Sequence, residues 1–137
     1  MSLVLTTSSN PGTATWQNAT TLPGTSLPLT YVPLTGTPYT IPDGENMIYM
    51  FETIGGNPEN IVLPVVADNI GRTLVILATG FGTITVATSG TDAIAPYFTG
   101  PFVLDGSNSP RCLTLVAISS AVYPIYGSDC WLIQSSF

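Results

Sequence analysis

The chain has 137 residues and ten formal charges: eight carboxylates and two arginines, with no lysine and no histidine. Only 7% of its residues are charged, whereas an ordinary soluble domain has about 25%. Two arginines cannot form a basic patch that follows phosphates or anionic lipids, so we expect no nucleic-acid binding and no electrostatic membrane contact.

So few charged side chains cover only a small part of the surface, and the rest must consist of hydroxyls, backbone and apolar atoms. A surface of this kind is poorly protected against association. Two explanations are open. The chain is either a free protein kept soluble by its many Thr and Ser residues, or a protein whose surface is buried in an assembly. We favour the assembly.

Residues 1–38 predict an extended, uncharged N-terminal arm, because no charged residue precedes Asp43. Prolines at positions 11, 23, 28, 33 and 38 prevent a helix and interrupt a central strand. Short apolar groups nevertheless recur along this segment, where a free linker would be more uniformly polar. We therefore expect the arm to bind a partner through Leu3, Val4, Leu5, Trp16, Leu27, Leu29, Tyr31 and Leu34.

Residues 39–137 predict one β domain. The segment 83–86 alternates strictly, which directs Ile84 and Val86 inward and the threonines outward. The segment 73–77 is apolar on both faces, which we interpret as a strand inside a sandwich. Further short apolar runs, bounded by turn residues, occupy 47–51, 61–63, 102–104, 113–116 and 131–133. The expected fold class is all-β: a compact β-sandwich or small barrel of about seven or eight short antiparallel strands, with an extended N-terminal arm.

Cys112 and Cys130 are expected to be reduced thiols that pack as small apolar side chains. If residues 112–118 and 129–135 form an antiparallel hairpin, Cys112 lies opposite about residue 135 and Cys130 opposite about residue 117. The two sulfurs then lie at opposite ends of the ladder, beyond bridging distance.

The sequence offers little for catalysis, since histidine is the commonest general base and metal ligand, and lysine supplies the amine of Schiff-base enzymes. We expect no catalytic residue, no cofactor and no metal site. Segments 43–46 and 105–109 carry oxygen ligands at alternate positions, but we interpret both as turns rather than calcium sites. A glycosidase-like carboxylate pair is the remaining enzymatic hypothesis, and we do not favour it.

We expect the polar side chains at predicted turns to stabilise the fold rather than bind a ligand. Asp92, Asp105 and Asp129 stand where a carboxylate accepts the backbone N–H groups of its own turn. Arg72 and Arg111 are expected to bond carboxylates or backbone carbonyls rather than a ligand.

Several small motifs stand in order along the β domain, at residues 61–64, 69–76, 80–86, 89–94, 113–116 and 131–133. Together they resemble a β module common in bacteriophage structural proteins, including tail-fibre and tail-spike proteins and proteins of virion surfaces. The resemblance covers about residues 39–137. In that module the Asn-x-Gly-Arg turn, the Gly-x-Gly hairpin and the Gly-x-Asp-x-Ile turn are scaffold features and imply no catalytic residue.

Among phage structural proteins, a chain this short is similar to capsid decoration, or cement, proteins. The resemblance implies a homotrimer on the outer capsid surface of the virion, with the major capsid protein and other copies of itself as partners. The arm would then contact the shell and stabilise it. The alternative is a tail-associated or fibre-tip protein that binds a host receptor or glycan through the loop aromatics Tyr97, Phe98, Phe102, Tyr123 and Tyr126.

Overall fold

The computed structural model describes residues 3–7, 14–18, 27–96, 101–122, 124 and 127–137, the first two ranges by their backbone. Strand β1 (Leu3–Thr7) pairs antiparallel with β2 (Ala14–Asn18) in a two-stranded sheet of its own. The expected extended arm therefore contains a β-hairpin. Its register places Leu5 opposite Trp16.

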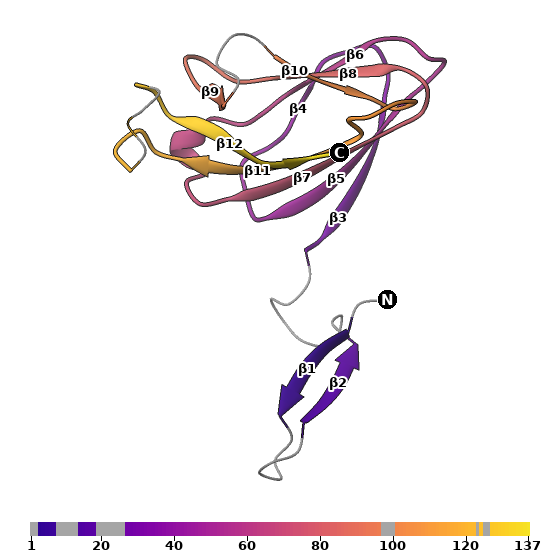
Figure 1. Ribbon diagram of the computed structural model, residues 1–137. Helices are drawn as coiled ribbons and strands as arrows, with labels where there is room; N and C mark the ends of the chain where they lie inside the picture. The colour runs from indigo at the N-terminus through magenta and orange to yellow at the C-terminus, as the bar shows by residue number, and fades with distance from the viewer. Residues whose placement is uncertain (1–2, 8–13, 19–26, 97–100, 123, 125–126) are drawn as a thin grey trace.

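From residue 29 onward the chain forms two sheets, which Figure 1 shows as two layers. The six-stranded sheet has the order β3-β5-β7-β11-β12-β9, and the four-stranded sheet has the order β10-β8-β6-β4. One 3-10 turn, η2 (Val66–Asp68), precedes β7. The strands of the six-stranded sheet are β3 (Leu29–Leu34), β5 (Met47–Thr53), β7 (Thr73–Thr79), β9 (Ala93–Ala95), β11 (Cys112–Ile118) and β12 (Cys130–Ser136). Those of the four-stranded sheet are β4 (Tyr39–Thr40), β6 (Glu59–Val62), β8 (Thr83–Ala87) and β10 (Phe102–Asp105).

The all-β class is confirmed, but the expectation of seven or eight antiparallel strands is wrong, because both sheets are mixed. From β3 to β8, successive strands alternate between the two sheets. Neighbours within a sheet are therefore second neighbours in the sequence, and they run in the same direction. The pairs β3–β5 and β5–β7 in one sheet, and β4–β6 and β6–β8 in the other, are accordingly parallel.

The core lies between the two sheets and receives alternate residues from each. Tyr49 and Phe51 of β5 stack with their ring centroids 5.6 Å apart. The Trp131 indole is fully buried, and its N–H donates to the Pro64 carbonyl at 3.0 Å. The remaining buried apolar side chains of the core are Leu34, Ile41, Ile61, Leu63, Val66, Leu74, Ile76, Ala78, Ile84, Val86, Ile94, Leu104, Leu113, Leu115 and Ala117.

The boundary expected at residue 38 differs from the structure, which places residues 29–34 in the six-stranded sheet. Prolines 28 and 33 had argued against a strand here. Both are tolerated because β3 is the edge of its sheet. The two-sheet domain therefore begins at Leu29, about ten residues earlier than the expected start at residue 39.

Candidate interaction surface

The outer face of the four-stranded sheet is polar. Along β8, Ile84 and Val86 point into the core, so Thr83 and Thr85 point outward, as the alternation predicted. The register then assigns their outward neighbours on β6 and β10. We call this surface the polar face: Thr40, Asn60, Val62, Thr83, Thr85, Ala87, Val103 and Asp105.

The outer face of the six-stranded sheet has the opposite character. On β5, Tyr49 and Phe51 belong to the core, so Ile48 and Met50 point away from it; on β7, the same holds for Val75. The register aligns these outward residues across strands β3, β5, β7, β11 and β12. We call this surface the apolar face: Leu29, Tyr31, Ile48, Met50, Val75, Leu77, Val116, Ile118 and Leu132.

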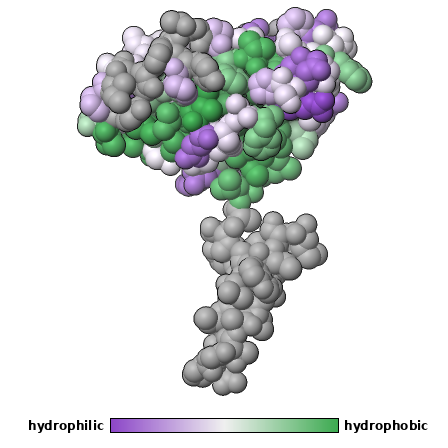
Figure 2. Space-filling view, viewed as in Figure 1, coloured by the Kyte–Doolittle hydropathy of each residue, from purple (hydrophilic) through white to green (hydrophobic). Residues whose placement is uncertain are grey.

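Apolar side chains of this face are paired with one another between β3 and β5, between β5 and β7, and between β11 and β12, whereas Val75 of β7 is paired with Thr114 of β11. Tyr31 is paired with Met50, which is paired with Leu77. Val116 is paired with Leu132. Figure 2 shows hydrophobic residues gathered over the layer that contains β3, β5, β7 and β11. An antiparallel or mixed sheet with one solvated face normally alternates apolar and polar residues, so an apolar outer face indicates a further covering layer.

At the β3 margin the face is most exposed. Leu29 and Tyr31 keep 58% and 54% of their surface accessible. The Tyr31 hydroxyl donates to the carboxylate of Glu52, and this bond raises the pKa of Tyr31. Glu52 is the single charged residue among the outward positions of the five strands, and its carboxylate already has a partner.

The free edge of β3 cannot form the complete set of backbone hydrogen bonds with another strand. The Pro28 carbonyl accepts the N–H of Ile48 at 2.9 Å, so the alternate residues Leu29, Tyr31 and Pro33 direct their peptide groups away from β5. Pro33 has no N–H to donate. A proline on an edge strand opposes strand addition, so the face is a better candidate than the edge.

The two cysteines are free and buried, as the sequence predicted. Cys130 is paired with Ile118, and the backbone N–H and C=O of Cys112 both bond Phe137. Both thiols therefore lie at opposite ends of the β11–β12 ladder. Burial raises the pKa of each, and for Cys130 the carboxylates of Asp129 and Asp92 add to this effect.

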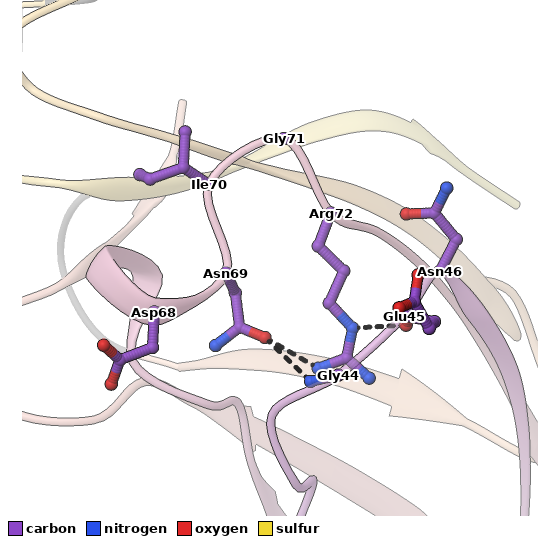
Figure 3. Close-up of a pocket in the computed structure, with 8 residues that line it drawn as sticks. All are labelled: Gly44, Glu45, Asn46, Asp68, Asn69, Ile70, Gly71 and Arg72. Atoms are coloured by element: carbon purple, nitrogen blue, oxygen red, sulfur yellow. Dashed lines mark hydrogen bonds between the residues drawn. The ribbon is translucent and has the colours of Figure 1, made fainter.

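Arg72 is a structural residue, which confirms its expected role. Its buried guanidinium donates from Nε to the Glu45 carbonyl at 2.6 Å and from Nη1 to the Pro42 carbonyl at 2.7 Å. The same Nη1 donates to Asn69 Oδ1 at 2.9 Å, and Asn69 donates in turn to Asp43 and to the Val65 carbonyl. Figure 3 shows the arginine held between two loops.

The shallow hollow beside Arg72, about 240 Å³ in volume, is lined by residues that this network already engages. They include Gly44, Asn46, Asn69 and Arg72. Asn46 accepts the backbone N–H of Thr73 at 2.8 Å. The polar groups of Asn46, Asn69 and Arg72 in this lining are therefore bonded within the protein.

The other polar candidates are also engaged in structural bonds. Asp105 accepts the N–H of Ser107 at 2.9 Å within its own turn, and these bonds lower its pKa. Asp92 and Asp129 instead accept backbone N–H groups of distant loops, at Val66 and Ser120 respectively, each at 2.8 Å. Arg111 donates to the Ser107 carbonyl, as expected. Within the described residues, no group of three or more Cys, Asp or Glu side chains could hold a metal ion.

The predicted partner contacts divide into three sets. The backbone of Leu3, Val4, Leu5 and Trp16 lies in the β1–β2 hairpin. Leu27, Leu29 and Tyr31 are exposed, the last two on the apolar face. Leu34 is only 2% exposed and lies in the core, because it is the inward-facing last residue of β3, so it is not a surface contact in this structure.

The sequence pattern missed most of the apolar face. The signal was present: residues 73–77 and 47–51 are apolar at nearly every position. We interpreted this as burial by the protein's own second sheet. Of the loop aromatics, Phe102 packs partly against the core, and Tyr97, Phe98, Tyr123 and Tyr126 lie outside the described residues.

Comparison of the chain with family models, with curated proteins and with solved structures finds no match. In the part of the chain that the structure describes, none of the helical segments has the length and apolar character needed to cross a membrane.

Proposed function

We propose that this chain is a non-enzymatic structural protein of a virion, a decoration or cement protein that associates with itself and stabilises the capsid from its outer surface. The phage assignment comes from the ordered turn motifs noted above. The apolar face carries the rest of the proposal. The outward positions of the six-stranded sheet include nine apolar residues, the threonines Thr73, Thr79 and Thr114, and one paired carboxylate, which suits a protein that works inside an assembly.

Attachment to the shell is assigned to the arm, now limited to residues preceding β3. This segment has no charge, and its backbone forms a hairpin of two five-residue strands. A hairpin can add to a sheet edge of the major capsid protein through main-chain hydrogen bonds. In an oligomer the arms of several copies bind together, and the raised effective concentration makes modest contacts durable.

The experiment is a co-sedimentation assay with purified capsids that lack the protein. Deletion of residues 2–26, which retains β3, is expected to abolish binding to the shell while far-UV circular dichroism shows an intact body. A Trp16→Asp variant of the full chain tests the same contact without truncation and should also weaken binding.

Equal binding by the full chain and both arm variants would contradict the arm's role. Binding to host cells, with no affinity for capsids, would instead favour the alternative of a tail-associated or fibre-tip protein.

A further inference from the structure

We infer that the apolar face is the surface through which copies of this chain associate, so that its occupant is a second copy rather than the shell. The inference rests on the proposed function, of which it names the self-association surface. It leaves the arm free for the capsid, and the two contacts can be tested separately.

The distribution of charge favours a second copy that contacts this chain through the apolar face. The net charge is −6, so two copies repel each other wherever their carboxylates meet. Of the eight carboxylates, Glu52 alone belongs to the outward rows of the six-stranded sheet, and it lies at the β3 margin bonded to Tyr31. Contact through the apolar face thus brings no unpaired charge to the centre of the interface, because the other carboxylates lie outside these outward rows.

The size of the face also fits. Five strands about 4.8 Å apart, with outward rows about 20 Å long, give roughly 500 Å² for each copy. Two copies then bury about 1,000 Å², which is the area that a specific interface needs. A sheet face requires no pocket in its partner, since two sheets pack with side chains interdigitated about 10 Å apart.

The centre of the face consists of residues that suit such packing. Val75 on β7 has Ile48 and Thr114 as its cross-strand neighbours, and Leu77 has Met50 and Cys112. All of these side chains except the buried Cys112 are partly exposed in the single chain, and none is part of the core between the sheets. They gain burial only when another layer covers them.

The test compares the same charge on the two outer faces of the full chain. Leu77→Asp places a carboxylate at the centre of the apolar face, and Thr85→Asp places one on the polar face. Light scattering coupled to size exclusion, over about 1–100 µM protein, should show an oligomer for the unmodified chain and for Thr85→Asp. It should show a monomer for Leu77→Asp, with a dissociation constant raised at least about 100-fold.

Circular dichroism verifies that each variant is folded. If Leu77→Asp does not fold, Leu77→Thr reproduces the chemistry of the polar face and should weaken association by about tenfold. An unmodified chain that stays monomeric at 100 µM overturns the inference, and so does a folded Leu77→Asp variant that associates normally. An oligomer that binds no capsid removes the proposed attachment to the shell and retains the inference. A monomer that binds capsids through its arm overturns the inference and retains that attachment.

Discussion

The polar face and the apolar face are the outsides of two sheets that share one core, yet they have different surfaces. On β8 the outward residues are threonines between inward Ile84 and Val86. On β7 the central outward residues Val75 and Leu77 are as apolar as the inward Leu74 and Ile76, and threonines occupy the two outward end positions, Thr73 and Thr79. The alternation along a strand determines whether a side chain points into the core or outward. The residue types at the outward positions indicate whether that face is exposed to solvent or covered by protein. We propose that water meets one face and a second copy of the chain meets the other.

The first prediction lowers the stability of the two-sheet domain without changing a residue of the polar face or the apolar face. Arg72→Ala removes a buried guanidinium that bonds the Glu45 and Pro42 carbonyls and Asn69. Because these acceptors then lose a charged donor, we expect a loss of about 3–5 kcal/mol in the free energy of unfolding.

Urea denaturation in the Leu77→Asp background, which we expect to be monomeric, measures this loss without a contribution from association. Arg111→Ala is the matched control, since the exposed Arg111 donates a single bond to the Ser107 carbonyl. Its expected cost is below about 1 kcal/mol. Equal costs for the two arginines would contradict the clamp that we assign to Arg72.

A second prediction converts the polar face into a copy of the apolar one. The double substitution Thr83→Val and Thr85→Val should keep the fold, because valine has the shape of threonine and favours strands. Both outer faces should then associate, and the hydrodynamic radius measured by dynamic light scattering should increase with protein concentration. A double variant as soluble as the unmodified chain would show that apolar outward residues alone do not cause association.

A third prediction concerns the thiols at the ends of the β11–β12 ladder. Burial raises the pKa of Cys112 and Cys130, so the reactive thiolate is scarce at pH 8. Both thiols should react with a disulfide reagent at least about tenfold more slowly in the native than in the urea-unfolded protein.

The sign of the pH dependence follows from the raised pKa in the folded state. The protonated thiols contribute stability fully below the pKa of an unfolded cysteine, about 8.5, and this contribution is lost as pH rises above it. A Cys112→Ala, Cys130→Ala variant should lose less stability than the unmodified chain between pH 8 and pH 10. Native thiols that react as fast as unfolded ones would contradict their burial.

The smallest effect is expected at Asp105 on the polar face. Its carboxylate accepts N–H groups of Ser107 and Asn108, which lowers its pKa. A lowered pKa contributes stability that is present above the ordinary carboxyl pKa and is lost as pH falls through the folded value. Asp105→Asn should therefore lower Tm slightly at pH 7, and the difference should vanish near pH 2. A difference of equal size at both pH values would contradict the role of the ionised carboxylate.

Local patterns predicted the parts of the fold that depend on neighbours in the sequence. The alternation around Ile84 gave the correct inward and outward directions of β8. The hairpin assumption placed Cys130 opposite about residue 117, and the structure pairs it with Ile118. The observed register differs from the expected one by one residue at Cys130, and the shift between Thr114 and Leu115 adds a second residue, so Cys112 bonds Phe137 rather than residue 135.

Long-range features were not accessible in the same way. The parallel pairs arise because successive strands alternate between sheets, and no single strand records which sheet it joins. The sequence analysis placed the residues of β3 in the arm because proline disfavours a central strand. An edge strand such as β3 tolerates proline. A strand that is apolar on both faces, such as 73–77, has the same sequence whether its own chain or another chain covers it. The apolar face therefore needed the sheet order before it could be recognised.

Carbene footprinting of the native full chain tests most directly whether another copy covers the apolar face. The label inserts into any accessible side chain, so Met50, Val75 and Leu77 can be compared with Thr85 and Val103 in one experiment. We predict that the first group is protected at high protein concentration, becomes labelled on dilution, and is labelled at every concentration in Leu77→Asp, while Thr85 and Val103 are labelled throughout. Labelling of both groups to the same extent at all concentrations would contradict the account.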